Sequence, residues 1–426
     1  MPAPELPDLI PLDEAQRRVL EGVSPLPAVT VDLAAADGLV LAAPVRSPLT
    51  VPTWANSAMD GFAVVSADVA AASPAAPVRL RVLGEVPAGR APDAGVAPGT
   101  ALRIMTGAMM PAGADAVVPV EDTDASHGAS EVPDAVAIRT GVRAGDNVRA
   151  AGTDVREGAL LLERGRACDP AAIALLAATG VARVEVHRRP RVAVISTGDE
   201  LVPPGEPLGP AQIHDANSLS LAAQAAEAGA EVRRMGIARD TLPALLALVR
   251  EAVAWADIVI LSGGVSVGAH DHVKAAFEDV GTLSLWRVAI KPGRPFAFAR
   301  AASGGHAVRL FGLPGNPVSV FVTFELFVRP VLRLLAGHPR AFDRPVRMAR
   351  LAEPMRGSAG RLNLTRVVLA PDPEHPDGVI ARSSGGQDSY MLASLAAANA
   401  LAFLPPGADL PAGAEVVVWE MRGRDT

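Results

Sequence analysis

Between about residues 190 and 337, short apolar runs alternate with segments whose apolar positions recur at helical spacing. The runs predict buried strands at 191–197, 232–237, 257–262, 283–290 and 296–299. The helical spacing predicts helices at 219–228, 242–253, 271–280 and 318–335, the second with Asp240 as its N-cap. This alternation is typical of a three-layer α/β domain with a mostly parallel sheet, which we place at 190–338.

The flanking regions have shorter, strand-like runs. After residue 339, apolar runs cut by Gly and Pro predict a small β-barrel or sandwich over 339–426. Before residue 190 lie two helical stretches, 13–22 and 169–180; the second has Asp169 as N-cap, Pro170 at N1 and Gly180 as stop signal. We expect an elongated mixed domain formed by 1–50 and 149–189, with a β-rich module inserted at 51–148.

The composition agrees with a turn-rich chain of two to four domains. It has 426 residues, with 39 Gly and 38 Pro. Ten Phe, four Trp and one Tyr predict cores of Ala, Val and Leu and disfavour a base-stacking platform. The net charge of −7 has the wrong sign for a general polyanion binder, so we expect no nucleic-acid partner.

The compartment can be predicted from cysteine usage and from the N-terminus. Cys168 is the single cysteine, which allows no intrachain disulfide and suits a reducing environment. It has no evident His partner, so we interpret it as structural. The N-terminus lacks a signal-like pattern, and no run reaches about 18 apolar residues. We expect a cytoplasmic protein that does not interact with membranes.

Three glycine-bearing turns follow predicted strands of the α/β domain. Because such sheets bind ligands at the carboxyl ends of their strands, we expect the turns to converge on one pocket. They are Thr197-Gly198-Asp199-Glu200, Ser262-Gly263-Gly264-Val265-Ser266 and Leu313-Pro314-Gly315-Asn316-Pro317. The second turn leads into the helix at 271 and could cradle a phosphate, although glycines at a strand end also make simple turns.

Lysine is scarce, and the position of one lysine is informative. Only Lys274 and Lys291 occur among 39 basic residues. Lys291 lies in a proline-stiffened turn flanked by Arg287 and Arg294, which favours an oxyanion clamp over a solvated turn. For Lys274, which lies one turn into the predicted helix at 271–280, a surface role is as plausible as a functional one.

Acidic residues recur in turns, several beside glycine, among them Asp60, Asp115, Asp154, Asp199, Glu200, Asp240 and Asp271. Each alone is explained by turn chemistry. If several converge near phosphate, they could hold Mg²⁺, which prefers oxygen ligands. His270 and His272 flank Asp271, but residues at i and i+2 do not share a helix face, which disfavours a metal pair.

Taken together, the motifs resemble the molybdopterin molybdenumtransferase family, the MoeA and gephyrin E-domain type. The matching strings occur in family order: 52–63 (PTWANSAMDGFA), 103–108 (RIMTGA), 113–118 (GADAVV), 196–201 (STGDEL), 261–268 (LSGGVSVG), 290–295 (IKPGRP) and 313–319 (LPGNPVS). Gly360-Arg361 and Ser389 also fit. The resemblance covers essentially the whole chain.

The resemblance implies the last step of molybdenum cofactor assembly, in which adenylyl-molybdopterin reacts with molybdate and releases AMP. It implies Mg²⁺ on Glu200, Asp240 and Asp271, and functional roles for Asp60, Asp154 and Lys291. The substrate-binding residues it suggests are Ser262, Gly263, Gly264, Ser266, Arg287, Arg294, Pro314, Gly315, Asn316, Arg361 and Ser389. Arg287 stands where a family member carries Lys.

The resemblance also implies a four-domain homodimer in which one subunit's first half completes the other's pocket. It suggests the preceding adenylyltransferase and recipient molybdoenzymes as partners. Two other functions remain open from the residues: the adenylyltransferase itself, which uses a similar α/β domain, and a non-catalytic scaffold. The long N-terminal half speaks against the first, and the chain shows no long linker or fused module that would favour the second.

Overall fold

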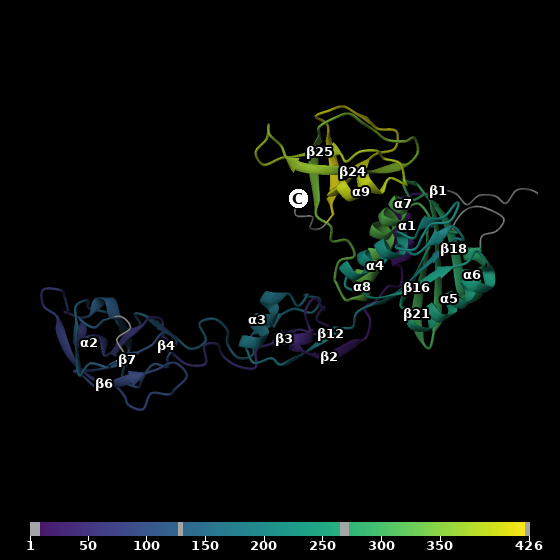
Figure 1. Ribbon diagram of the computed structural model, residues 1–426. Coiled ribbons are helices and arrows are strands. Elements are labelled where there is room, and N and C mark those ends of the chain that lie inside the picture. The colour runs from purple at the N-terminus through teal and green to yellow at the C-terminus, as the bar shows by residue number, and fades with distance from the viewer. Residues whose placement is uncertain (1–8, 127–130, 265–271, 422–426) are drawn as a thin grey trace, which may run out of the picture. The chain divides into compact units, whose positions relative to one another are not determined.

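The computed structural model describes residues 9–126, 131–264 and 272–421, which form two units. One unit comprises 1–29, 38–42 and 185–426, and the other comprises 30–37 and 43–184. The chain crosses between the two units four times, within β2 (Ala28–Asp32), after residue 37, after residue 42 and within β12 (Arg183–His187). Strands β2 and β12 pair with each other. Figure 1 shows the helices and strands of both units.

The first unit contains a seven-stranded sheet. Its order is β1 (Leu9–Ile10), β18 (Gly281–Val288), β20 (Pro295–Ser303), β21 (His306–Leu313), β17 (Ile258–Ser262), β13 (Arg191–Thr197) and β16 (Glu231–Ala238). All adjacent pairs are parallel except those of β20, which runs antiparallel to β18 and β21. This confirms the mostly parallel sheet.

Helices cover both faces of this sheet. Along β13, Val192 and Val194 pack with α1 (Leu12–Leu20), α4 (Asn217–Glu227), α7 (Pro317–Thr323) and α8 (Arg329–Leu335) in one core. Ala193 and Ile195 pack in a second core with α5 (Leu242–Trp255) and α6 (His272–Val280). Side chains alternate across a strand, so a strand buried on both faces is apolar throughout. The three-layer prediction is confirmed.

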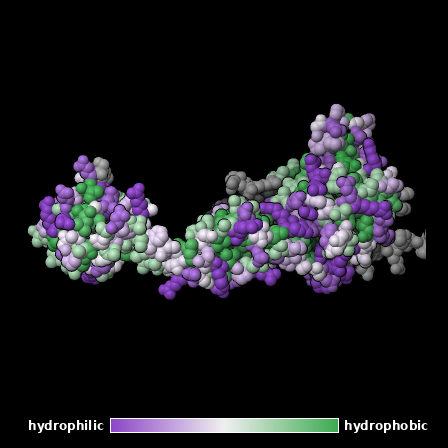
Figure 2. Space-filling view, turned by 90° about the horizontal axis from the view of Figure 1, so that it is seen from below, coloured by the Kyte–Doolittle hydropathy of each residue, from purple (hydrophilic) through white to green (hydrophobic). Residues whose placement is uncertain are grey.

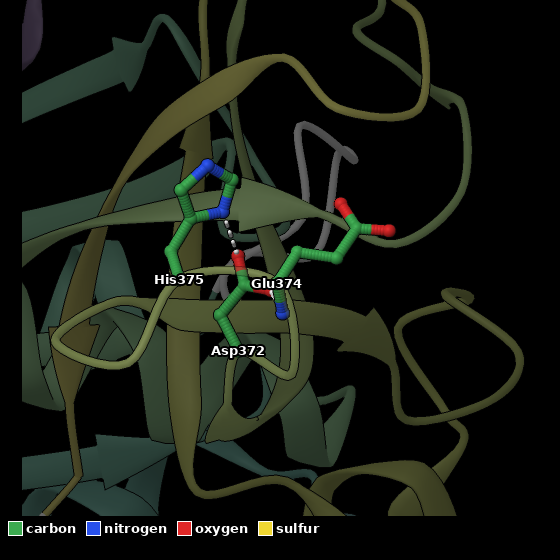
Figure 3. Close-up of side chains that lie close together, drawn as sticks. All are labelled: Asp372, Glu374 and His375. Carbon is green, nitrogen blue, oxygen red and sulfur yellow. Dashed lines mark hydrogen bonds and ion pairs between the residues drawn. The ribbon is translucent and has the colours of Figure 1, made fainter.

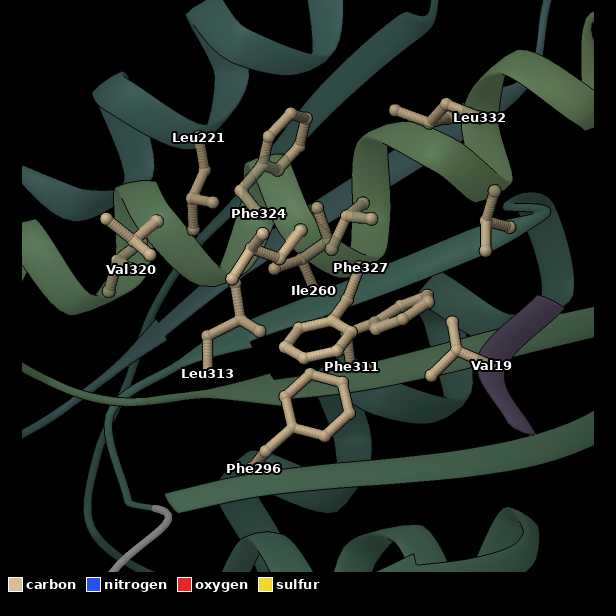
Figure 4. Packing of buried hydrophobic residues seen from close by; sticks show 14 of the residues in the cluster. Val19, Leu221, Ile260, Phe296, Phe311, Leu313, Val320, Phe324, Phe327 and Leu332 are labelled. Carbon is tan, nitrogen blue, oxygen red and sulfur yellow. The ribbon is translucent and has the colours of Figure 1, made fainter. Parts of the chain in front are cut away.

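The larger of these cores is built mainly of Ala, Val and Leu, as the composition predicts, but it also contains several phenylalanines. Phe296, Phe311, Phe324 and Phe327 are all buried there, and the rings of Phe296 and Phe327 lie 4.5 Å apart (Figure 4). Phe324 and Phe327 belong to a π-helical turn, η3 (Phe324–Val328), between α7 and α8. The predicted helix at 318–335 therefore exists with an interruption. The few aromatic residues are concentrated here because large rings fill the broad sheet-to-helix space.

The C-terminal part of the same unit is a closed five-stranded barrel, as predicted. Its strands are β24 (Leu362–Pro371), β25 (Val379–Ser383), β22 (Val346–Leu351), β28 (Glu415–Glu420) and β26 (Ala400–Leu404), and β26 pairs back with β24. A short strand from the α/β domain, β19 (Ile290–Lys291), extends this sheet by pairing with β24. The smaller elements are β23 (Met355–Arg356), β27 (Asp409–Leu410) and α9 (Leu392–Ala397).

The second unit is rich in short strands. A five-stranded sheet has the order β8 (Ala116–Pro119), β5 (Gly61–Val64), β7 (Thr100–Ile104), β6 (Val78–Val86) and β9 (Ala135–Ile138). Two further pairs are β4 (Asn56–Ser57) with β10 (Val148–Arg149), and β3 (Val45–Arg46) with β11 (Leu160–Leu162). The helices are α2 (Ser66–Val69) and α3 (Pro170–Ala178). The Asp169 side chain accepts the Ala172 N–H, which confirms the predicted N-cap.

The surface mixes polar and apolar residues. On the face displayed in Figure 2, hydrophilic and hydrophobic residues are interspersed over each unit. Among the described residues, no helix is both long and apolar enough to span a membrane.

Candidate functional site

Three turns at the carboxyl edge of the sheet line one cavity, which we call the strand-end cavity. Thr197 ends β13 and Glu200 follows it, Ser262 ends β17 and Gly263 follows it, and residues 315–317 follow β21. Parallel neighbouring strands end at the same edge, which brings their turns together. The prediction that these turns share a pocket is confirmed.

A glycine allows the backbone of the second turn to approach the first closely. Gly263 has φ +96°, and a Cβ at this position would lie 2.6 Å from the carbonyl oxygen of Thr197. A side chain there would both strain the backbone and push the turns apart. Gly263 is therefore required by the turn itself, as well as lying on the cavity wall.

The amide of Asn217 ties two of the turns together. Its Nδ2 donates to Ser262 Oγ at 2.8 Å and to the Gly315 carbonyl at 2.7 Å. Nearby, Asp215 is 4% exposed, and its Oδ1 accepts from Ser196 Oγ at 2.9 Å and from the Ser218 N–H at 3.0 Å. The sequence interpretation missed both residues. Asparagine is scarce in this chain, and that scarcity was the available signal.

A second cavity, the basic cavity, lies where the α/β domain meets the barrel. The parallel pairing of β19 with β24 places Lys291 opposite Asn363 and Ile290 opposite Leu362, directly after Arg361. Lys291, Arg294 and Arg361 line this cavity together with Pro314, Asp388 and Ser389. Gly315 and Asn316 line both cavities, so the two adjoin.

The cations of the basic cavity are not neutralised by acids. Lys291 Nζ donates to Ser358 Oγ at 3.1 Å. Within the described part of the chain, no carboxylate oxygen lies within 4.0 Å of the charged nitrogens of Lys291, Arg294 or Arg361. Three unpaired cations around one hollow favour an oxyanion ligand, because charge-assisted hydrogen bonds to an oxyanion are strong.

Ser389 is fixed at the boundary between the two cavities. Asn316 Nδ2 donates to its Oγ at 2.9 Å, and the Val318 N–H donates to its carbonyl at 3.0 Å. These bonds join a barrel loop to the start of α7. Tyr390, the single tyrosine, follows Ser389 and lines the strand-end cavity while remaining 64% exposed.

Two of the three predicted metal ligands lie at neighbouring strand ends. Glu200 lines the strand-end cavity, and Thr197 Oγ1 donates to Asp240 Oδ1 at 2.9 Å. The prediction of Asp240 as the N-cap of α5 was wrong: Thr241 holds that position, and the Asp240 carboxylate is engaged by Thr197 instead. Asp271 and Ser266 lie outside the described residues, as does His270.

Asp60 and Asp154 belong to the second unit. The amide and Oγ1 of Thr106 both donate to Asp60 Oδ1 at 2.7 Å, and Asp60 lines a small cavity with Arg103. Asp154 lies in a turn in which its N–H donates to the Val51 carbonyl at 3.2 Å. The structure assigns these acids to this unit and gives Asp60 a defined orientation.

Two sequence candidates lie apart from the cavities. Arg287 is on β18, between Leu9 and Pro295, and is not among the described residues that line the basic cavity. Cys168 is fully buried, and burial, together with the charges of Asp169 and Asp37, raises the pKa of its thiol. A protonated, inaccessible thiol is a poor nucleophile, which agrees with a structural role.

An acidic group in the barrel has metal-like spacing but already contains a cation. Asp372, Glu374 and His375 lie close together (Figure 3). The Arg350 guanidinium donates to both Asp372 oxygens at 2.8 Å and reaches Glu374 at 2.7 Å, and it holds the pKa of Asp372 well below its usual range. The guanidinium supplies the positive charge that a metal would bring, so this group is an ion-pair network.

Comparison with known proteins places this geometry in context. Models of the MoeA N-terminal region (domains I and II), the probable molybdopterin binding domain and the MoeA C-terminal region (domain IV) match residues 10–180, 193–334 and 348–421. Molybdopterin molybdenumtransferase 2 of Mycobacterium tuberculosis is 40% identical over 96% of this chain and 99% of its own. The molybdopterin molybdenumtransferase of Bacillus subtilis is 37% identical over 93% of this chain and 90% of its own.

Solved structures agree. Two crystal structures of molybdopterin biosynthesis MoeA proteins from Pyrococcus horikoshii superpose with TM-scores of 0.80 and 0.77, at 33% and 28% identity. They cover 98% and 97% of this chain, and all of their own chains are matched.

Proposed function

The chain belongs to the MoeA family, and we propose that it is a molybdopterin molybdenumtransferase, which transfers molybdenum from molybdate to adenylyl-molybdopterin and releases AMP. The observation that carries this proposal is the pair of adjoining cavities. One is lined by three cations that form no ion pair with a described residue, the other is lined by the turns at the strand ends, and Gly315 and Asn316 line both. A reaction between an oxyanion and a nucleotide-linked pterin needs two such neighbouring sites.

In this proposal the basic cavity holds molybdate. Lys291, Arg294 and Arg361 neutralise the dianion, and Ser389 Oγ adds a hydrogen-bonding group. Ser389 is already oriented by Asn316, so it costs little reorganisation when the oxyanion enters. Arg287, which is absent from this wall, has no direct role here.

The strand-end cavity holds the adenylate. The Ser262-Gly263 turn offers a hydroxyl and backbone close to the pocket, and Asn217 keeps it in register with Gly315. Polar groups fixed in advance at this edge would orient the phosphate toward the basic cavity. AMP can then depart from the strand-end side once molybdenum is bound.

Mg²⁺ is the cation we propose at the acidic side, on Glu200 and Asp240, with Asp271 as the third group. Carboxylate oxygens suit this ion. Glu200 forms no ion pair within the described part of the chain, and its carboxylate folds over Gly198, where a Cβ would lie 2.5 Å from Oε2. Bound Mg²⁺ would stabilise negative charge on the departing AMP.

The proposal extends to assembly and partners. We propose a homodimer in which Asp60 and Asp154 of one subunit serve the pocket of the other, since both acids lie in the unit that does not contain the two cavities. The preceding adenylyltransferase would supply the nucleotide, and molybdoenzymes would receive the product. A cytoplasmic location suits a chain whose single cysteine is free and buried.

The test is product release. Purified protein given adenylyl-molybdopterin, molybdate and Mg²⁺ should release AMP, and omission of molybdate or Mg²⁺ should slow it. Incubation with ATP and molybdopterin should give no adenylylated product, and its rapid formation would assign the preceding step instead. Binding of the pterin nucleotide with no AMP release under complete conditions would favour a scaffold.

A further inference from the structure

Arg366 is a fully buried arginine beneath the loop that carries Ser389. We call residues 384–390 the Ser389 loop. The Arg366 guanidinium donates from Nη2 to the carbonyls of Gly386 at 2.6 Å and Asp388 at 3.2 Å, and from Nε to Ser394 Oγ at 2.9 Å. One side chain thus fastens two carbonyls of the loop to the barrel.

The backbone of Arg366 fastens the same loop again. Its N–H donates to Gln387 Oε1 at 2.9 Å, and its carbonyl accepts from Gln387 Nε2 at 3.0 Å and from the Ser384 N–H at 3.1 Å. The loop is also tight, because a Cβ on Gly386 would overlap the side chain of Met391. The conformation of the Ser389 loop therefore depends largely on one position of β24.

The Arg366 guanidinium has no carboxylate within ion-pairing distance among the described residues, although the charge of Asp388 acts on it from farther away. Its Nη1 is buried and has no hydrogen-bond acceptor within the described ranges. Burial lowers the pKa of this guanidinium, which is a measure of how unfavourable the site is for a cation. Burying an apolar side chain would cost less free energy than burying this charge, so core packing alone does not explain an arginine at this position.

Three residues of the loop, Gln387, Asp388 and Ser389, line the basic cavity and have backbone N–H groups that bind no other described residue. Arg366 donates hydrogen bonds to two carbonyl groups of the same loop. An oxyanion is the ligand that free amides and a nearby buried cation both favour.

We propose that Arg366 is a positioning residue for oxyanion binding: it holds the carbonyls of the Ser389 loop and so presents the loop's amide groups and Ser389 to the anion in the basic cavity. This inference rests on the proposed function, because it takes molybdate as that anion. Arg366 itself lies beneath the loop and is not among the residues lining the cavity.

Arg309 provides a matched control. It is 6% exposed, its Nε is buried without an acceptor, and burial lowers its pKa as well. It lies near the start of β21, away from the strand end that carries residues 314–317. Arg366→Gln and Arg309→Gln thus remove equivalent buried charges, one beneath the loop and one remote from it.

The experiment measures molybdate binding by titration calorimetry on the full chain, with circular dichroism confirming folding. Arg366→Gln should raise the Kd for molybdate about 10-fold or more, whereas Arg309→Gln should change it less than about 2-fold. In turnover, Arg366→Gln should raise KM for molybdate while kcat at saturating molybdate and KM for the nucleotide stay near wild type. Ser394→Ala removes the acceptor of Arg366 Nε and the hydrogen bond that Ser394 Oγ donates to the Met391 carbonyl, but leaves both loop carbonyls bound to Nη2. It should give a smaller change in the same direction and serves if Arg366→Gln does not fold.

If folded Arg366→Gln binds molybdate as tightly as wild type, the positioning role is overturned and the proposed function stands. If only Ser394→Ala folds, unchanged binding by that variant has the same consequence. Equal weakening by Arg309→Gln would also overturn the positioning role, since it would reveal a general loss of stability. A wild-type chain that binds no molybdate would overturn the proposed function, and this inference with it.

Discussion

The basic cavity and a buried ion-pair cluster in the same unit contain similar residues arranged to opposite effect. We define the ion-pair cluster as Glu325, Arg329, Asp343 and Arg344. Arg329 Nε lies 3.2 Å from Asp343 Oδ1, and Arg344 Nε lies 2.9 Å from Glu325 Oε2. The three cations of the cavity form no ion pair with any described residue, although Asp388 also lines the cavity, whereas the cluster pairs each cation with a carboxylate.

Charges that stabilise the fold can therefore be distinguished from charges that bind a ligand by whether they already have partners. In the ion-pair cluster, the attraction between partners offsets the desolvation cost of each buried charge. Removing one partner leaves the other charge buried without that compensation. In the basic cavity the cations remain hydrated until an anion arrives, so their removal should cost binding and turnover rather than stability.

The largest effect expected is on turnover in the basic cavity. Lys291→Ala should lower kcat/KM by roughly 10²–10³-fold if Lys291 stabilises oxyanionic charge during transfer. The measurement is AMP release from adenylyl-molybdopterin with molybdate. The control is Arg250→Ala, which removes an exposed cation of α5 that pairs with Asp279 of α6. This variant should release AMP at the wild-type rate. Wild-type turnover by Lys291→Ala would exclude this role.

In the ion-pair cluster, Arg329→Met should instead destabilise the fold, by about 3 kcal/mol, because Glu325 and Asp343 then each lose one of the cations that offset their burial. Urea unfolding gives the free energy, and molybdate Kd should stay within about 2-fold of wild type. Arg250→Met, at a surface pair, should cost less than about 1 kcal/mol. Equal costs for the two variants would mean that burial does not distinguish these pairs.

The pH dependence of stability should also report the ion-pair cluster. Burial alone would raise the pKa of Asp343, but the hydrogen bonds from Arg329 and the charges of Arg333 and Arg344 lower it overall, below the ordinary 3.8. A lowered folded-state pKa gives stability that is present above the ordinary pKa and is lost as pH falls toward the folded-state value. The urea concentration at the unfolding midpoint should therefore decrease as the pH is lowered below about 4. An Asp343→Asn variant that retains the full wild-type slope would contradict this assignment.

The smallest effect concerns the strand-end cavity. Tyr390 offers an exposed ring beside a polar pocket, and stacking on a flat heterocycle is worth about 1 kcal/mol. Tyr390→Leu should raise KM for adenylyl-molybdopterin about 3–10-fold with kcat unchanged. Tyr390→Phe keeps the ring and should match wild type, so a loss as great as that of the Leu variant would point to the hydroxyl instead.

Much of the α/β domain could be predicted because its strands are buried on both faces. The run at 191–197 is apolar and β-branched for that reason, and β13 has the predicted bounds. The interruption at η3 could not be predicted, since Phe324 to Val328 are all buried and leave no one-sided pattern. Strand β21 was also missed, although it lies near the centre of the sheet.

The residues of the candidate site also fall into those that the sequence could identify and those that it could not. Lys291 was recognisable by its scarcity and by its family motif, and the strand-end turns by their glycines. Asn217 and Arg366 were not, because their roles depend on partners far away in sequence or on a loop whose path no local pattern shows. The Asp240 prediction failed for a related reason: a hydroxyl from a neighbouring strand competes for its carboxylate.

Anomalous diffraction from crystals soaked with molybdate would locate the bound anion. We expect a molybdenum peak in the basic cavity, within hydrogen-bonding reach of Lys291 and Arg361 and beside the Ser389 loop. A fully occupied peak elsewhere, with the basic cavity lacking anomalous density, would contradict this expectation.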